Sequence, residues 1–92
     1  MQSGPIPYDQ VPRQPTPPNL RRWCTAYLGH ILDLPEDRVD LYRGLGEYGL
    51  DSMDAVVMAG EMEDHFQLEI DPAVFLRQES LGALIDGIGR RD

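Results

Sequence analysis

The sequence predicts an all-α fold, a small four-helix bundle with three longer helices, one short helix and a long first loop. Apolar residues recur at helical spacing in separate segments, and no segment has the alternation of a convincing strand. With 92 residues, the chain can build one modest hydrophobic core but not a deep catalytic cavity. We therefore expect a single small helical bundle.

The N-terminal segment differs from the rest of the chain in composition. Residues 1–18 hold six of the eight prolines and have no repeated apolar period, which is typical of a disordered arm or linker. From Leu20 onward the apolar residues follow helical spacing up to the next proline, and Thr16 or Asn19 can cap this first helix. The folded domain is therefore expected at residues 19–92.

A loop and a second helix follow. Residues 35–50 contain three glycines and scattered apolar residues, as expected of a long loop that is attached to the core. The next segment lacks proline and ends at a polar residue, so that a helix is predicted from Ser52 to Phe66, with Asp51 as its cap.

Two shorter elements complete the bundle. Asp71 and Pro72 are typical of a cap and a first helical position, so they predict a short third helix. The last helix is expected to begin at Ser80 and to end near Gly89.

The second helix has two apolar stripes, because residues are separated by about 100° around a helix axis. The inner stripe should pack in the core and consists of Ala55, Met58, Ala59, Met62 and Phe66. The outer stripe consists of Met53, Val56, Val57 and Gly60, edged by Asp54, Glu61 and Asp64. Unpaired burial of those carboxylates would be costly, so we interpret the outer stripe as a docking surface for partner proteins. The alternative is burial of both stripes between neighbouring helices.

Charge narrows the classes of partner. The chain has 16 acidic and 8 basic residues, and its formal net charge is −8. Half of the acids lie between Gly44 and Leu76, a segment without lysine or arginine. Nucleic acids and anionic membranes are therefore poor partners, whereas a protein with a basic patch is a good one. A solvated acidic surface without a partner is the alternative.

Ser52 lies where the second helix begins. Backbone N–H groups and the helix dipole stabilise a phosphate-like oxyanion at such a position, although a serine there can also be a simple cap. A hydrolytic serine needs a general base, and neither His30 nor His65 has a sequence setting that suggests one. Modification of Ser52 by another protein is therefore favoured over catalysis by Ser52.

Cysteine and histidine usage indicates neither a disulfide nor a metal site. Cys24 is the single cysteine, and we expect it in the core. No zinc-ligand spacing occurs. Without a signal-peptide pattern or an apolar run of transmembrane length, we expect a cytoplasmic protein.

The run "GLDSMDAVVMAGEMEDHFQLEIDP", residues 49–72, resembles the acyl carrier protein family. The hallmark of that family is an Asp-Ser-Leu motif at the start of the second helix, and here it reads Asp51-Ser52-Met53. The sequence of this run is most similar to that of polyketide synthase carrier domains. The resemblance covers about residues 20–90.

The resemblance implies a non-enzymatic carrier of acyl or polyketide intermediates. In the family, the serine that matches Ser52 is esterified by 4'-phosphopantetheine from coenzyme A, and acyl chains are carried as thioesters on the arm. Implied partners are a phosphopantetheinyl transferase, an acyltransferase or acyl ligase, a ketosynthase and tailoring enzymes with basic docking patches. The isolated domain should be monomeric.

Departures from the family pattern leave alternatives. Met53 replaces the usual Leu at nearly constant volume, and Val57 stands where many fatty-acid carriers have Glu. "LRQES" at residues 76–80 replaces a motif that is frequent in polyketide carriers, so the resemblance does not specify the exact conformation of the third helix. The alternative functions are a peptidyl carrier domain of a peptide synthetase, an unmodified helical interaction module and a small hydrolase.

Overall fold

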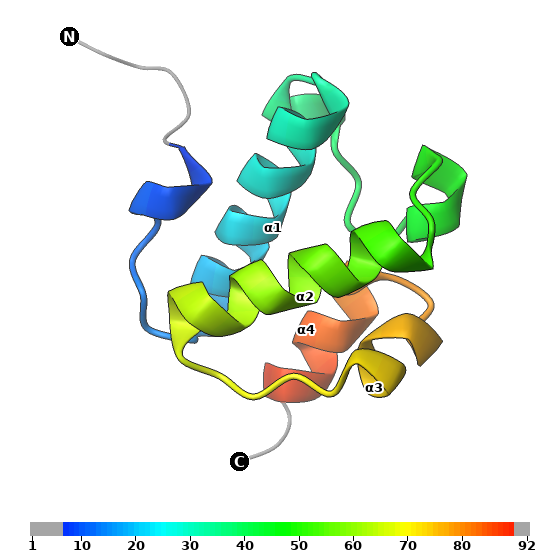
Figure 1. The fold of residues 1–92 in the computed structure, drawn as a ribbon. Helices are drawn as coiled ribbons and strands as arrows, with labels where there is room; N and C mark the ends of the chain where they lie inside the picture. The colour runs from blue at the N-terminus through cyan, green and yellow to red at the C-terminus, as the bar shows by residue number, and fades with distance from the viewer. Residues whose placement is uncertain (1–6, 90–92) are drawn as a thin grey trace, which may run out of the picture.

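The computed structural model describes residues 7–89. Within this range the chain forms the helices α1 (Pro17–Leu32), α2 (Ser52–Phe66), α3 (Pro72–Arg77) and α4 (Leu81–Gly89) (Figure 1). Three short 3₁₀ helices accompany them: η1 (Tyr8–Gln10), η2 (Glu36–Arg38) and η3 (Leu45–Tyr48). These residues include no strand. The predicted bundle of three longer helices and one short helix is confirmed.

α1 begins at Pro17, as expected if Thr16 rather than Asn19 is its cap. The Thr16 hydroxyl accepts a hydrogen bond from the backbone N–H of Asn19 at 3.3 Å, so Thr16 is the cap. Prolines fit the first turn because an N–H at these positions would lack a helical partner anyway. The helix ends at Leu32, and the next residue, Asp33, is its C-cap with a φ of 58° in the left-handed region.

Tyr8 and Val11 of the N-terminal segment pack against the helices, although a disordered arm was predicted for residues 1–18. The Tyr8 ring lies edge-on to Trp23, with 5.7 Å between ring centroids, and edge-on to Tyr27, at 5.0 Å. Val11 is part of the hydrophobic core. The part of the prediction that concerns residues 1–6 lies outside the described residues.

The reason for this packing is that a few anchors suffice for a segment rich in proline. Proline fixes φ in the unfolded chain as well, so less conformational entropy is lost on ordering. Val11 contributes apolar burial, and its carbonyl oxygen lies 2.7 Å from Nε2 of the buried His65. Tyr8 and Val11 therefore belong to the packed structure, although the folded domain was predicted to begin at Asn19.

The hydrophobic core lies between the four helices. α1 packs on α4, and α2 packs on α3. The largest fully buried side chains include Trp23, Leu20, Leu28, Met58, Met62 and Ile85. Cys24 is a buried free thiol, as predicted, and desolvation raises its pKa.

The loop between α1 and α2 is attached to this core. Its half-buried apolar side chains, which pack on the core cluster, are Val39, Leu41, Leu45 and Leu50. This agrees with the predicted attached loop, although η2 and η3 give it more regular structure than glycines suggested.

Between residues 7 and 89, no helix has both the length and the apolar character needed to cross a membrane. The same residues contain no group of three His, Cys, Asp or Glu side chains arranged to hold a metal ion.

Candidate functional site

Ser52 is presented by a tight turn that joins η3 to α2. Gly49 ends η3 with a φ of 82°, a conformation that glycine adopts without steric cost. The backbone N–H of Leu50 donates to the carbonyl oxygen of Leu45 at 3.1 Å and closes the turn. Ser52 is then the first residue of α2, and its side chain is exposed.

The cap of α2 is formed by two aspartates. Asp51 accepts a hydrogen bond from the backbone N–H of Asp54 at 2.9 Å, and Asp54 accepts one from the backbone N–H of Asp51 at 3.1 Å. The predicted cap by Asp51 is confirmed, and capping is therefore not the role of Ser52. Accepting the Asp54 backbone N–H lowers the pKa of the Asp51 carboxyl below its ordinary value.

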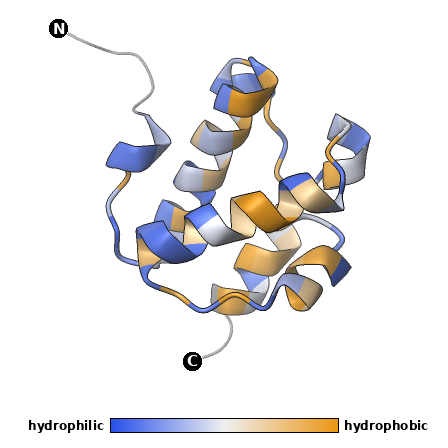
Figure 2. Cartoon of the chain, in the orientation of Figure 1, coloured by the Kyte–Doolittle hydropathy of each residue, from blue (hydrophilic) through white to orange (hydrophobic). Residues whose placement is uncertain are grey.

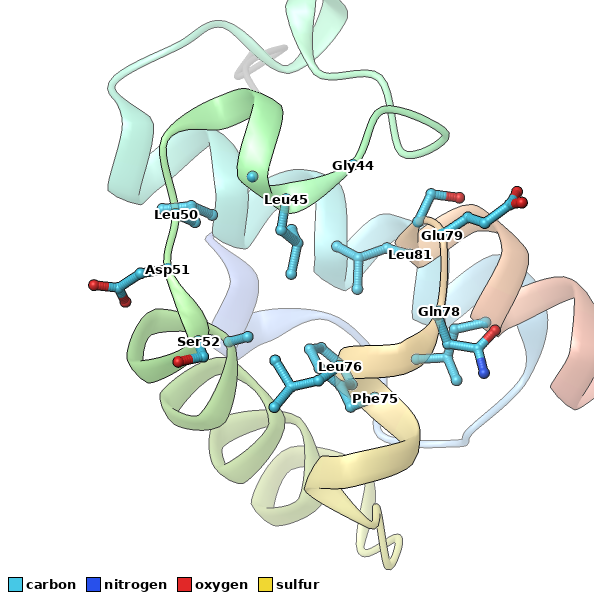
Figure 3. A pocket seen from close by; sticks show the side chains of 14 residues that line it. Gly44, Leu45, Leu50, Asp51, Ser52, Phe75, Leu76, Gln78, Glu79 and Leu81 are labelled. Carbon is cyan, nitrogen blue, oxygen red and sulfur yellow. The ribbon is translucent and has the colours of Figure 1, made fainter.

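A cavity of about 250 Å³ opens beside Ser52 (Figure 3). Figure 3 shows Leu45 and Leu81 pointing towards its interior, whereas the carboxylate of Asp51 points away from it. The cavity is lined by residues of the loop, α2, α3 and α4, namely Gly44, Leu45, Gly46, Leu50, Asp51, Ser52, Ala55, Phe75, Leu76, Gln78, Glu79, Ser80, Leu81 and Leu84. Ser52 thus lies at the edge of a partly apolar space that four parts of the chain enclose.

Most residues that line this cavity were not predicted from the sequence as part of the site. The residues of α3 and α4 that face Ser52, such as Phe75 and Leu81, belong to helices that were predicted correctly. Their spacing shows that they are apolar on one side, but it does not show the angle between helices. Only the packing of α2 on α3 brings Phe75 near Ser52.

The two apolar stripes of α2 differ in burial as predicted. The inner stripe is buried throughout. In the outer stripe, Met53 is 71% exposed, Val56 42% and Val57 53%. Figure 2 shows hydrophobic residues in the middle of α2 and hydrophilic ones towards its C-terminal end. The alternative in which both stripes are buried is therefore excluded.

The acids at the edge of the outer stripe lie at two separate positions along α2. Asp54 is exposed in the first turn, next to Ser52. Glu61 and Asp64 are exposed in the C-terminal half of α2, where they line a second cavity of about 170 Å³ with Arg13. Gly60, which directly precedes Glu61 in α2, is half-buried. The N-terminal segment thus places Arg13 beside Glu61 and Asp64, which belong to a stretch of sequence without lysine or arginine.

Neither histidine of the described chain is placed to activate Ser52. His65 is buried, with Nε2 at 2.7 Å from the Val11 carbonyl oxygen. It lies near the opposite end of α2 from Ser52, about 20 Å away at 1.5 Å per residue. His30 lies in α1, with its ring centroid 5.6 Å from that of Tyr8.

Comparison with known proteins adds independent evidence. Residues 22–88 match the family described as "Phosphopantetheine attachment site". The chain is also 32% identical over 66 residues to one component of the phenolphthiocerol/phthiocerol polyketide synthase, both in Mycobacterium tuberculosis (strain ATCC 25618 / H37Rv) and in Mycobacterium bovis (strain ATCC BAA-935 / AF2122/97). The aligned region covers 72% of this chain and 4% of those relatives. No solved structure matches the chain significantly.

Helix order, an exposed serine that opens α2 and a family match over most of the chain agree with one another. Carrier domains of this family hold a 4'-phosphopantetheine prosthetic group and are not themselves catalytic. The chain therefore belongs to the phosphopantetheine attachment site family and is a carrier protein or carrier domain.

Proposed function

We propose that this chain is an acyl carrier of a polyketide synthase and that Ser52 is the residue to which 4'-phosphopantetheine is attached. The observation that carries the assignment is the position of Ser52, which is exposed at the first residue of α2 while Asp51 provides the cap. The chain spans only 4% of the length of its polyketide synthase relatives. Polyketide chemistry is therefore inferred from the kinship of this one segment.

The surroundings of Ser52 fit the prosthetic group. Its exposed hydroxyl is accessible to a modifying enzyme, and the N-terminus of a helix favours the negative charge of a phosphodiester. Leu45, Phe75 and Leu81 offer apolar surface in the adjoining cavity. When attached, the group supplies a terminal thiol that carries acyl chains as thioesters. This chain then contributes presentation, and the chemistry belongs to partner enzymes.

The outer face of α2 is the proposed docking surface for those partners. Met53, Val56 and Val57 are exposed, and Asp54, Glu61 and Asp64 lie along the same helix. Partners would be a phosphopantetheinyl transferase, an acyltransferase or acyl ligase, a ketosynthase and tailoring enzymes, each with Lys and Arg around an apolar contact. The transferase needs coenzyme A, so we place the protein in the cytoplasm.

Three other functions receive less support. The relatives belong to polyketide synthases rather than to peptide synthetases, which favours an acyl carrier over a peptidyl carrier. The family match favours a modified carrier over an unmodified interaction module. A hydrolase would need a base at Ser52, and His65 is buried near the other end of α2.

The assignment is tested by the intact mass of the protein after incubation with coenzyme A and a broad-specificity phosphopantetheinyl transferase. We expect the wild-type chain to gain one phosphopantetheine and Ser52→Ala to gain none, with unchanged helix content. Ser80→Ala is the matched control, because Ser80 is buried and its hydroxyl accepts the backbone N–H of Ala83 at 3.1 Å. Loading of Ser52→Ala, or no loading of the wild-type chain, would contradict the assignment.

A further inference from the structure

One wall of the cavity beside Ser52 is fastened to α4 through Tyr42. The Tyr42 hydroxyl donates a hydrogen bond to Oδ2 of Asp86 at 2.8 Å, and the Leu41 carbonyl oxygen accepts one from the backbone N–H of Gly82 at 2.8 Å. The other carboxylate oxygen of Asp86 lies 2.7 Å from Nη2 of Arg21 in α1. The carboxylate of Asp86 in α4 thus contacts both Tyr42, at the start of the loop that forms this wall, and Arg21 in α1.

The contact between Tyr42 and Gly82 depends on the absence of a side chain on the glycine. A Cβ atom at Gly82 would lie 2.5 Å from Cε1 and 2.7 Å from Cζ of the Tyr42 ring, distances that real side chains do not tolerate. Tyr42 is nevertheless 59% exposed. Burial in the core therefore does not account for the position of this ring, whereas its contacts with α4 do.

The rest of the loop is braced by its own residues. The Tyr48 hydroxyl accepts a hydrogen bond from the Asp40 backbone N–H at 2.7 Å and donates one to the Asp40 carbonyl oxygen at 3.1 Å. Arg43 and Glu47 form an ion pair at 3.3 Å. A loop with this internal bracing is expected to shift as a unit, so that its attachment to α4 controls its position.

The same loop carries the residues that face Ser52. Gly44, Leu45 and Leu50 line the cavity on the loop side, and Leu81 and Leu84 line it on the α4 side. A change in the distance between loop and α4 therefore changes the opening of the cavity and the support of the turn that precedes Ser52.

We infer that Tyr42 is a positioning residue for the modification site: with Asp86 and Arg21 it holds residues 40–50 on α4 and keeps the turn before Ser52 ready for the enzyme that modifies it. This inference rests on the proposed function of Ser52. The expected consequence is kinetic. If the turn is ordered in only a fraction of molecules, the transferase meets fewer competent ones, and the apparent KM for the carrier rises while kcat changes little.

The first test compares two tyrosine variants that each lose one hydroxyl. Tyr42→Phe removes the bond to Asp86, whereas Tyr8→Phe changes a ring that packs on α1 through edge contacts. In Tyr42→Phe, amide hydrogen exchange at residues 44–50 should accelerate about threefold to tenfold, as expected for one lost hydrogen bond, with α1 amides unchanged. Tyr8→Phe should leave residues 44–50 unaffected. Equal acceleration in α1 would show a general loss of stability and overturn the inference.

The second test uses the close approach at Gly82. Gly82→Ala should displace the Tyr42 ring and accelerate exchange at residues 44–50. In a Tyr42→Ala background the ring is absent, so the same change should add nothing. Additive effects of the two changes would mean that Gly82 acts through helix propensity alone and would overturn the contact argument.

The third test measures loading by the transferase with coenzyme A. Tyr42→Phe and Asp86→Asn should raise the KM for the carrier about threefold with kcat nearly unchanged. Asp37→Asn, an exposed aspartate in η2, is the charge-matched control and should leave KM unchanged. Wild-type KM in Tyr42→Phe despite faster exchange in the loop would refute the positioning role and leave Ser52 as the attachment point. Failure of the wild-type chain to load would instead refute the proposed function, while the exchange experiments would still decide whether Tyr42 fastens the loop.

Discussion

The two faces of α2 carry similar residues and have opposite environments. Met62 on the inner face is 1% exposed, whereas Met53 on the outer face is 71% exposed. The same side chain thus belongs to the core in one position and to the surface in the other. The difference teaches that apolar character alone does not predict burial in this helix, and that the carboxylates next to Met53 indicate the open side.

The largest expected effect comes from a matched pair of methionine truncations. Met62→Ala should lower the free energy of unfolding by about 2–5 kcal/mol, because it removes buried atoms and leaves a cavity. Met53→Ala should change it by less than about 0.5 kcal/mol, as is usual for an exposed position. Urea denaturation followed by circular dichroism measures both. Similar losses for the two variants would abolish the distinction between the faces.

The second prediction asks what the outer face does instead. Met53→Ala and Val56→Ala should each lower kcat/KM for loading by a phosphopantetheinyl transferase about fivefold, as expected for apolar contacts near the centre of an interface. Stability should remain close to that of the wild-type chain. Val74→Ala, which changes a half-buried valine in α3, serves as a comparison outside the docking face. Unaltered loading of both outer-face variants would remove this face from recognition.

The third prediction concerns the acids at the edge of the outer face. Glu61→Lys should slow loading about twofold to fivefold at low ionic strength, because exposed charges steer encounter, and the effect should shrink as salt shortens the Debye length below about 10 Å. The matched reversal Asp37→Lys in η2 should have little effect. Asp54 and Asp86 are unsuitable for this comparison, since Asp54 belongs to the cap of α2 and Asp86 binds Tyr42 and Arg21. A salt-independent defect in Glu61→Lys would argue against steering.

The smallest expected effect is a dependence on pH at the start of α2. The pKa of Asp51 is lower in the folded chain than its ordinary value of 3.8, so its ionised form stabilises the fold above that pH. The contribution is lost as the pH falls through the lowered pKa. Asp51→Asn should therefore be less stable than the wild-type chain at neutral pH, and the difference should disappear in acid. Because Asp51 is exposed, we expect a small difference.

Sequence patterns predicted the parts of the molecule that depend on neighbours along the chain. The bounds of α2 followed from Asp51 as a cap and from helical spacing up to Phe66, and the structure has the same bounds. The start of α3 followed from Asp71 and Pro72 in the same way. These features are encoded within one or two turns of helix.

The parts that were missed depend on contacts between distant residues. Val11 is one apolar residue among prolines, and its burial requires the surface that α1 and His65 provide. The network of Tyr42, Asp86 and Arg21 joins residues that are far apart in the chain, and no spacing rule connects them. Asp54 was predicted only as an acid at the edge of the docking surface, and its role in the cap of α2 was missed.

The burial of Cys24 has a practical consequence for following the protein at work. The thiol is fully enclosed, and the chain has no other cysteine. A membrane-impermeant chromogenic thiol reagent should therefore find no rapidly reacting group on the unmodified native chain. Each attached arm brings one solvent-accessible sulfur, and each acyl group that is loaded hides it again. The stoichiometry of labelling would thus report how many molecules carry an arm that is not acylated, and it should rise as arms are attached and fall as acyl groups are loaded.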